Sequence, residues 1–179
     1  LKSKTMINID SEEDDTMTVS CAGGADFLAT FNFQRETVNG TRIELILKGL
    51  KGGHSGIEID KGRVNANILA GRVLNHFKTT DFNLLSISGG DKTNAITNLC
   101  KIDLCVKNSE QFIKDANEYL EIIKAEISAR EPDFCYKLNT LENGNFEAIN
   151  KESQNAIIYA LTCMPNGVLD MSAEITGLV

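Results

Sequence analysis

The chain has 179 residues, of which 42% are hydrophobic and 24% charged, with two prolines and no tryptophan. These values are typical of a globular domain with its own core and exclude a disordered chain. A net charge of −7 argues against nucleic acid as a partner, because neutralising phosphates requires clustered Lys and Arg, and no apolar run approaches the roughly 20 residues that span a bilayer.

The N-terminal part of the chain predicts short strands. Residues 5–10 favour β-structure and end at Asp10, in an acidic cluster. Residues 17–21 and 26–36 alternate apolar and polar side chains, as strands with one buried face do. The glycines in "CAGG", residues 21–24, would let the chain leave one body and enter another, so the sequence predicts a domain boundary there.

The strongest predicted strand covers residues 41–50, in which Ile43, Leu45 and Leu47 share one face. A glycine-rich loop follows. Apolar residues at helical spacing then predict a helix over residues 63–78, with Val64, Ile68 or Leu69, Val73 and Phe77 inward. Two further strands are expected at residues 82–90 and 96–106, separated by the turn "GGDKTNA".

A second long helix is expected to begin with Ser109 as its cap and to stop before Pro132. Residues 134–141 predict a strand and "ENGN", residues 142–145, a turn. A third helix is expected over residues 150–163. The predicted inward residues are, in the second helix, Phe112, Ala116, Tyr119 or Leu120, Ile123 and Ile127, and, in the third, Ile157, Ala160, Leu161 and Met164.

Between residues 41 and 141 the predicted order is strand, helix, strand, strand, helix, strand. This order is typical of an α+β, ferredoxin-like two-layer sandwich, in which an antiparallel sheet carries its helices on one face.

Five cysteines form no CxxC pair and have no histidine at metal-ligand spacing. We therefore expect reduced, mostly buried thiols and a cytoplasmic protein. The chain starts at Leu1 and ends at "EITGLV", which reads as the middle of a strand, so we expect a piece of a longer protein.

One of the two histidines, His54, lies in "GLKGGHSG", residues 49–56. Glycines let the backbone approach a ligand closely, and a histidine there could donate to an oxyanion or to a substrate carboxylate. A solvated or structurally bonded histidine fits the same loop. His76, near the end of the predicted helix, is expected to be a favourable partner for the helix dipole.

Asn94 lies in the glycine-rich turn between two predicted strands, either as a turn residue or as an amide that binds substrate. The same turn lacks the GxxxxGK[ST] spacing of a phosphate-binding loop. Asp10 ends a strand, where a solvated acid and a ligand carboxylate are both plausible. Without an HExxH motif or a Cys/His cluster, the chain is not expected to complete a metal site alone.

Five motifs resemble, in this order, those of the aminoacyl-histidine (Xaa-His) dipeptidases, which belong to a two-zinc metallopeptidase family. They are "INIDSEE", "CAGG-D", "LKGLKGGHSG-EI--GR-NAN", "GG-K-NAI" and "PNGV---S-E--GLV". The resemblance covers nearly the whole chain. It implies that residues 1–24 are a remnant of the zinc-binding catalytic domain and that residues 25–179 are a lid/dimerisation domain, incomplete at its C-terminus.

The resemblance also implies roles for single residues. Asp10 resembles a carboxylate ligand of one of two zinc ions, His54 the lid histidine that stabilises the oxyanion, and Asn94 an amide that helps hold the substrate's C-terminal carboxylate. The implied partners are a dipeptide such as β-alanyl-histidine, the rest of the catalytic domain, and a second copy in a homodimer. Because the other zinc ligands would lie outside the chain, this piece alone is expected to be inactive.

Two alternatives stay open. The first is a broad-specificity dipeptidase or tripeptidase of the same family, because no residue here reads the substrate's side chain. The second is a binding or assembly module without chemistry, which a start codon and a stop codon at these ends of the gene would favour.

Overall fold

The structure is a computed structural model, and it describes residues 4, 5, 7, 15–17 and 23–177. The chain divides into two compact units, residues 1–30 and 31–179, and each is described by itself. In the first unit, the described residues form no helix or strand. Asp10 and most of the strands predicted at residues 5–10 and 17–21 lie outside the described residues. The strand predicted at residues 26–36 is wrong for residues 26–34, which are exposed and pair with no strand. Strand structure begins at residue 35.

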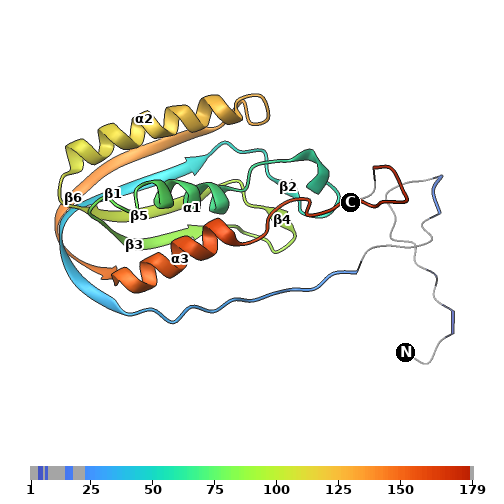
Figure 1. Cartoon of the computed structure of the whole chain (residues 1–179), viewed down its shortest axis with the longest axis horizontal. Coiled ribbons are helices and arrows are strands. Elements are labelled where there is room, and N and C mark those ends of the chain that lie inside the picture. The colour runs from blue at the N-terminus through green and yellow to red at the C-terminus, as the bar shows by residue number, and fades with distance from the viewer. Residues whose placement is uncertain (1–3, 6, 8–14, 18–22, 178–179) are drawn as a thin grey trace. The chain divides into compact units, whose positions relative to one another are not determined.

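The second unit is built around a four-stranded sheet in the order β3-β5-β1-β6, with every neighbouring pair antiparallel (Figure 1). Its strands are β1 (Arg35–Lys48), β3 (Phe82–Gly89), β5 (Cys100–Val106) and β6 (Cys135–Ile149). Its helices are α1 (Ala66–His76), α2 (Ser109–Ile127) and α3 (Lys151–Cys163), and a short 3-10 helix covers Ile59–Lys61. This arrangement confirms the predicted α+β, ferredoxin-like fold.

The three helices cover one face of the sheet. Side chains from all three join the inward residues of β1, Ile43, Leu45 and Leu47, in one apolar cluster. Residues between these in the chain point to the opposite face, as strand geometry requires. That face is mixed: Arg42 pairs with Asp103 at 3.0 Å, and Cys105, opposite Arg42 in the register, forms a small buried apolar cluster with Leu85 and Ala148. The sheet therefore has one buried face and one more polar face.

The helices begin at caps that are all asparagines. Asn65 caps α1 by accepting from the backbone N–H of Asn67, so this helix is shorter than the predicted 63–78. Asn108, and not Ser109 as predicted, caps α2, because its side chain accepts from the N–H of Gln111. The predicted stripe of α2 is confirmed: Phe112, Ala116, Leu120, Ile123 and Ile127 are buried.

Strand β6 runs through residues 142–145, where a turn was predicted. The tertiary pairing overrides the local turn signal, because Gly144 and Asn145 lie opposite Gly40 and Asn39 of β1. The inward face of α3 agrees with the prediction in part: Ile157 packs, half-buried, against the apolar cluster, but Gln154 and Ile158 are the buried residues of α3 and Met164 is 46% exposed.

Of the four cysteines in the described residues, Cys100 and Cys105 are buried, Cys135 is half-buried and Cys163 is exposed, and all four are free thiols. Burial raises the pKa of the Cys100 thiol to about 12. Among the described residues, no helix is both long and apolar enough to cross a bilayer.

Candidate functional site

Two short strands bring the glycine-rich loop and the Asn94 turn together. Strand β2 (Gly53–His54) pairs with β4 (Ala95–Ile96) in an antiparallel two-stranded sheet. Directly beside this pair, the N–H of Ser55 donates to the carbonyl of Asn94 at 3.0 Å. His54 and Asn94, which are 40 positions apart in the sequence, are thus neighbours in the fold.

His54 and Asn94 line one pocket of about 360 Å³. Lys92 and Asp91 contribute charged groups to the same lining. Both predicted site residues are exposed, so their side chains are accessible to a ligand. The structure therefore supplies an imidazole and an amide at the wall of one open hollow.

The imidazole of His54 has a defined hydrogen-bonding pattern. Its Nδ1 accepts from the backbone N–H of Gly56 at 3.0 Å and of Ile57 at 3.2 Å. A ring nitrogen that accepts carries no proton, so the neutral ring holds its proton on Nε2. None of the described residues hydrogen-bonds to Nε2. The loop therefore presents His54 as a hydrogen-bond donor through Nε2.

Glycines are required around this ring. Gly53 has φ of 129°, and a Cβ there would collide with the side chains of Arg63 and Glu58. Gly56 lies so close to the imidazole that an added Cβ would sit 3.3 Å from Cε1 of His54. The missing side chain of Gly53 thus leaves room for the Glu58–Arg63 ion pair, and that of Gly56 leaves room for the His54 ring.

A charged pair lies inside the loop. Glu58 Oε2 accepts from the backbone N–H of His54 at 2.9 Å, and its Oε1 pairs with Arg63 at 2.7 Å and with Lys61 at 3.1 Å. Arg63 also donates to the carbonyl of Gly52. The hydrogen bond from the His54 N–H, followed by that from Lys61, lowers the pKa of Glu58 to about 2. Both residues belong to the motif that carries the family resemblance, but neither was assigned a role from the sequence.

A buried acid closes the base of the loop. Glu131, only 1% exposed, accepts from the N–H of Lys51 at 2.8 Å and from the N–H of Val64 at 3.0 Å. The two ends of the loop are thereby tied to one carboxylate. This residue was also missed, and no local pattern marks it, because its partners are 80 and 67 positions away.

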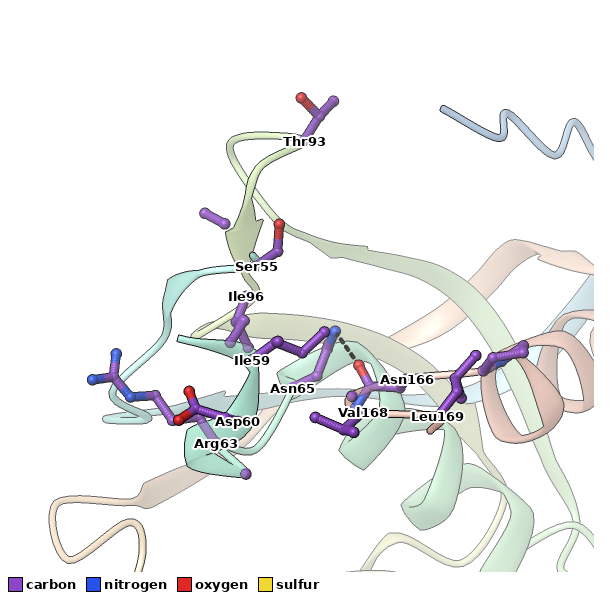
Figure 2. A pocket seen from close by; sticks show the side chains of 14 residues that line it. Ser55, Ile59, Asp60, Arg63, Asn65, Thr93, Ile96, Asn166, Val168 and Leu169 are labelled. Atoms are coloured by element: carbon purple, nitrogen blue, oxygen red, sulfur yellow. Dashed lines mark hydrogen bonds between the residues drawn. The ribbon is translucent and has the colours of Figure 1, made fainter. Parts of the chain in front are cut away.

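A second pocket, of about 640 Å³, adjoins the same loop. Figure 2 shows Ser55 and Thr93 at one end of it and, at the other, Asn166, Val168 and Leu169 from the segment after α3. Asn65 donates to Asn166 at 3.1 Å across this pocket (Figure 2). The loop is therefore flanked by two hollows.

The other predicted site features are placed as follows. His76 ends α1 and its ring stacks on Tyr119, with 3.6 Å between the ring centroids, which is a packing contact. Asp10 is not described. Within the described residues, no group of three or more His, Cys, Asp or Glu could hold a metal ion. The residues described here therefore do not fit a zinc site.

Comparisons with known proteins agree with this fold. The peptidase dimerisation domain model matches residues 45–135. The chain is 36% identical to the cytosol non-specific dipeptidase of Escherichia coli, over all of this chain and 38% of that protein. The crystal structure of the aminoacylhistidine dipeptidase of Vibrio alginolyticus matches 83% of this chain and 31% of that chain, with 34% identity and a TM-score of 0.78. The chain thus spans well under half of both relatives, and it belongs to the M20 peptidase dimerisation domain family.

Proposed function

We propose that the chain is the lid and dimerisation part of a metal-dependent dipeptidase, and that His54 and Asn94 are its contribution to the active site. The observation that carries this proposal is the β2–β4 pairing, which puts both side chains on the wall of one pocket. The family membership and the names of the two dipeptidase relatives support it.

The proposed role of His54 is to stabilise negative charge on the scissile carbonyl. Its Nδ1 is occupied by two backbone N–H groups, so Nε2–H is the ring's free donor. A donor held ready where charge develops stabilises the transition state without reorganising. Asn94 would donate from its amide to the C-terminal carboxylate of the dipeptide, a group that is present throughout the reaction.

The proposal includes two zinc ions, held by residues other than those described here. Bound zinc lowers the pKa of a water molecule and polarises a carbonyl. Asp10 is proposed as one ligand, in a catalytic-domain remnant formed by residues 1–24. The family description supports a homodimer, and the name of the Escherichia coli relative supports a cytoplasmic location.

The proposed substrates are Xaa-His dipeptides such as β-alanyl-histidine, as the name of the Vibrio alginolyticus relative suggests. Broad dipeptide specificity is the second candidate, and the name of the Escherichia coli relative favours it. The two candidates differ in whether histidine at the second position is required.

The test is an assay of the full product of the gene that encodes this chain, with added zinc. β-Alanyl-histidine and β-alanyl-alanine are compared as substrates for the wild type, His54→Ala and Asn94→Ala. His76→Ala is the matched control, since it removes the other histidine. We expect His54→Ala to lower kcat on the order of a hundredfold or more, as loss of an oxyanion donor does. Asn94→Ala should mainly raise KM, because it removes binding to a group that does not react.

Each outcome decides one point. Hydrolysis of β-alanyl-histidine alone supports the Xaa-His candidate, and equal hydrolysis of both dipeptides supports broad specificity. Wild-type kcat in His54→Ala would remove the histidine from the mechanism and leave the dipeptidase intact. A zinc-loaded protein that cleaves neither dipeptide would contradict a dipeptidase and favour a binding or assembly module.

A further inference from the structure

The backbone that leads into His54 is held by one ion pair. Glu58 accepts from the His54 N–H at 2.9 Å and binds Arg63 at 2.7 Å, while Arg63 donates to the carbonyl of Gly52, two residues before the histidine. The pair thus spans the backbone from Gly52 to His54. The side chains of Glu58 and Arg63 are 24% and 21% exposed, although their neighbours Asp60 and Lys61 are exposed.

Hydrogen bonds that His54 accepts and one that it donates close the turn that follows it. The His54 side chain accepts from the N–H groups of Gly56 and Ile57, and the Glu58 side chain accepts from the N–H of His54. The carbonyl of His54 also accepts from the N–H of Glu58 at 3.2 Å. This arrangement resembles a capping box, in which the first residue's side chain and a later acid satisfy each other's backbone donors, except that the imidazole accepts from Gly56 and Ile57 and not from the N–H of Glu58. Here the capping side chain is an imidazole, so the same bonds that close the turn also fix the ring's tautomer.

The ion pair differs from an ordinary surface pair. An exposed pair usually contributes little, because long side chains lose entropy when they are held in one geometry. This pair is built into the loop, since Gly53 has no Cβ at the place where Arg63 and Glu58 approach its backbone. By contrast, Arg72 and Glu126 form a bidentate pair at 2.6 and 2.8 Å between α1 and α2, with side chains 41% and 52% exposed.

We propose that Glu58 and Arg63 are positioning residues that hold the His54 imidazole as an Nε2–H donor at the pocket wall. Only its catalytic consequence, an effect on kcat, rests on the proposed function. Its structural part, that the pair holds the backbone of the turn in which the N–H groups of Gly56 and Ile57 fix the tautomer and orientation of the ring, stands on the hydrogen bonds alone.

The structural part is tested by ¹⁵N NMR of the two imidazoles in this 179-residue chain. Glu58→Gln keeps the size of the side chain, but it replaces one of the two oxygens that accept from His54 and Arg63 with an NH2 group, which donates. We expect the wild type to show His54 as a single Nε2–H tautomer and Glu58→Gln to show a mixture of tautomers. Arg63→Lys, which keeps the charge but loses the forked donor, should give a similar mixture. His76 serves as the internal reference, and Glu126→Gln, which breaks the pair between α1 and α2, as the matched control.

A wild-type His54 spectrum in both loop variants would overturn the proposal, as would an equal change in Glu126→Gln. If Glu58→Gln does not fold, seen as a shifted His76 signal, Arg63→Lys decides the question by the same criterion. Because no activity is measured, this result does not depend on the dipeptidase assignment.

The catalytic part is tested with the same variants of the full gene product. We expect kcat to fall on the order of tenfold with KM within about twofold, since a displaced donor weakens transition-state binding more than ground-state binding. The double variant Glu58→Gln/Arg63→Lys should lose no more than the worse single variant, because both act through one imidazole. Additive losses, or a loss confined to KM, would overturn the positioning role. If His54→Ala itself leaves kcat unchanged, the proposed function fails and the NMR result still stands.

Discussion

The sheet with its helices and the loop over residues 51–63 are stabilised by different interactions. In the sheet and helices, side chains such as Leu45, Leu104 and Leu120 are at most 1% exposed and pack in one apolar cluster. In the loop, Gly52 is the one buried residue, and the conformation depends on the carboxylates of Glu58 and Glu131. Apolar burial is non-directional, whereas hydrogen bonds fix the orientation of particular groups. Stability and the placement of the candidate site should therefore respond to different mutations.

The largest expected effect lies in the apolar cluster. Leu120→Ala should lower the free energy of unfolding by about 2–5 kcal/mol, because it removes fully buried methyl groups and leaves a cavity. Denaturation by urea measures this change. The control is Ile122→Ala, on the same helix but 61% exposed, which should stay within about 0.5 kcal/mol of the wild type. Equal losses in the two variants would contradict the assigned inward face of α2.

At the base of the loop we expect a smaller loss of unfolding free energy, together with faster hydrogen exchange at the amides that Glu131 binds. Glu131→Gln leaves one of the N–H groups of Lys51 and Val64 facing an amide NH2 in place of an acceptor oxygen, at a cost of about 1–3 kcal/mol. Hydrogen exchange should accelerate at these two amides more than at amides of β1. Unchanged protection of both amides would show that the loop ends are held by other contacts.

Acid should weaken the loop through Glu58. Its pKa is lowered to about 2 in the folded chain against an ordinary value of 4.5, so its contribution is complete above about pH 5 and is lost as pH falls toward 2. The difference in unfolding free energy between the wild type and Glu58→Gln should thus be largest at neutral pH and shrink by pH 3. A difference that grows on acidification would contradict the bonds from His54, Lys61 and Arg63.

The smallest expected change in stability is at Gly56. An added Cβ in Gly56→Ala would sit 3.3 Å from the His54 ring, so the ring must move by a few tenths of an ångström. We expect less than about 1 kcal/mol of destabilisation, together with a shifted His54 NMR signal. Gly144→Ala is the control, because its Cβ would meet Phe146 at an ordinary 3.7 Å. An unmoved His54 signal would show that the ring tolerates the methyl group.

The parts of the fold that could be predicted are those with a periodic pattern. Ile43, Leu45 and Leu47 recur at every second position, and the stripe of α2 repeats at helical spacing, so both buried faces followed from the sequence. The turn expected at residues 142–145 failed because "ENGN" is a local signal, whereas the pairing of Gly144 with Gly40 is a distant one.

The candidate site was predictable only in part. His54 and Asn94 were singled out by their motifs, but nothing in two-residue strands predicts that β2 and β4 pair. The roles of Glu58 and Arg63 depend on backbone groups that become neighbours only when the turn closes. Glu131 lies beyond the second helix, and its link to Lys51 has no signature in the local sequence.

The pairing of β1 with β6 has a consequence for synthesis of the chain. Partners such as Asn39 and Asn145 are 106 positions apart, so the side of β1 that pairs with β6 stays open until β6 has been made. Contacts of such long sequence separation form slowly, because a large loop must close first. During translation, the nascent chain therefore carries an unpaired strand edge for most of its synthesis. Chaperones would engage the chain at this edge. Premature termination before β6 would leave an aggregation-prone product.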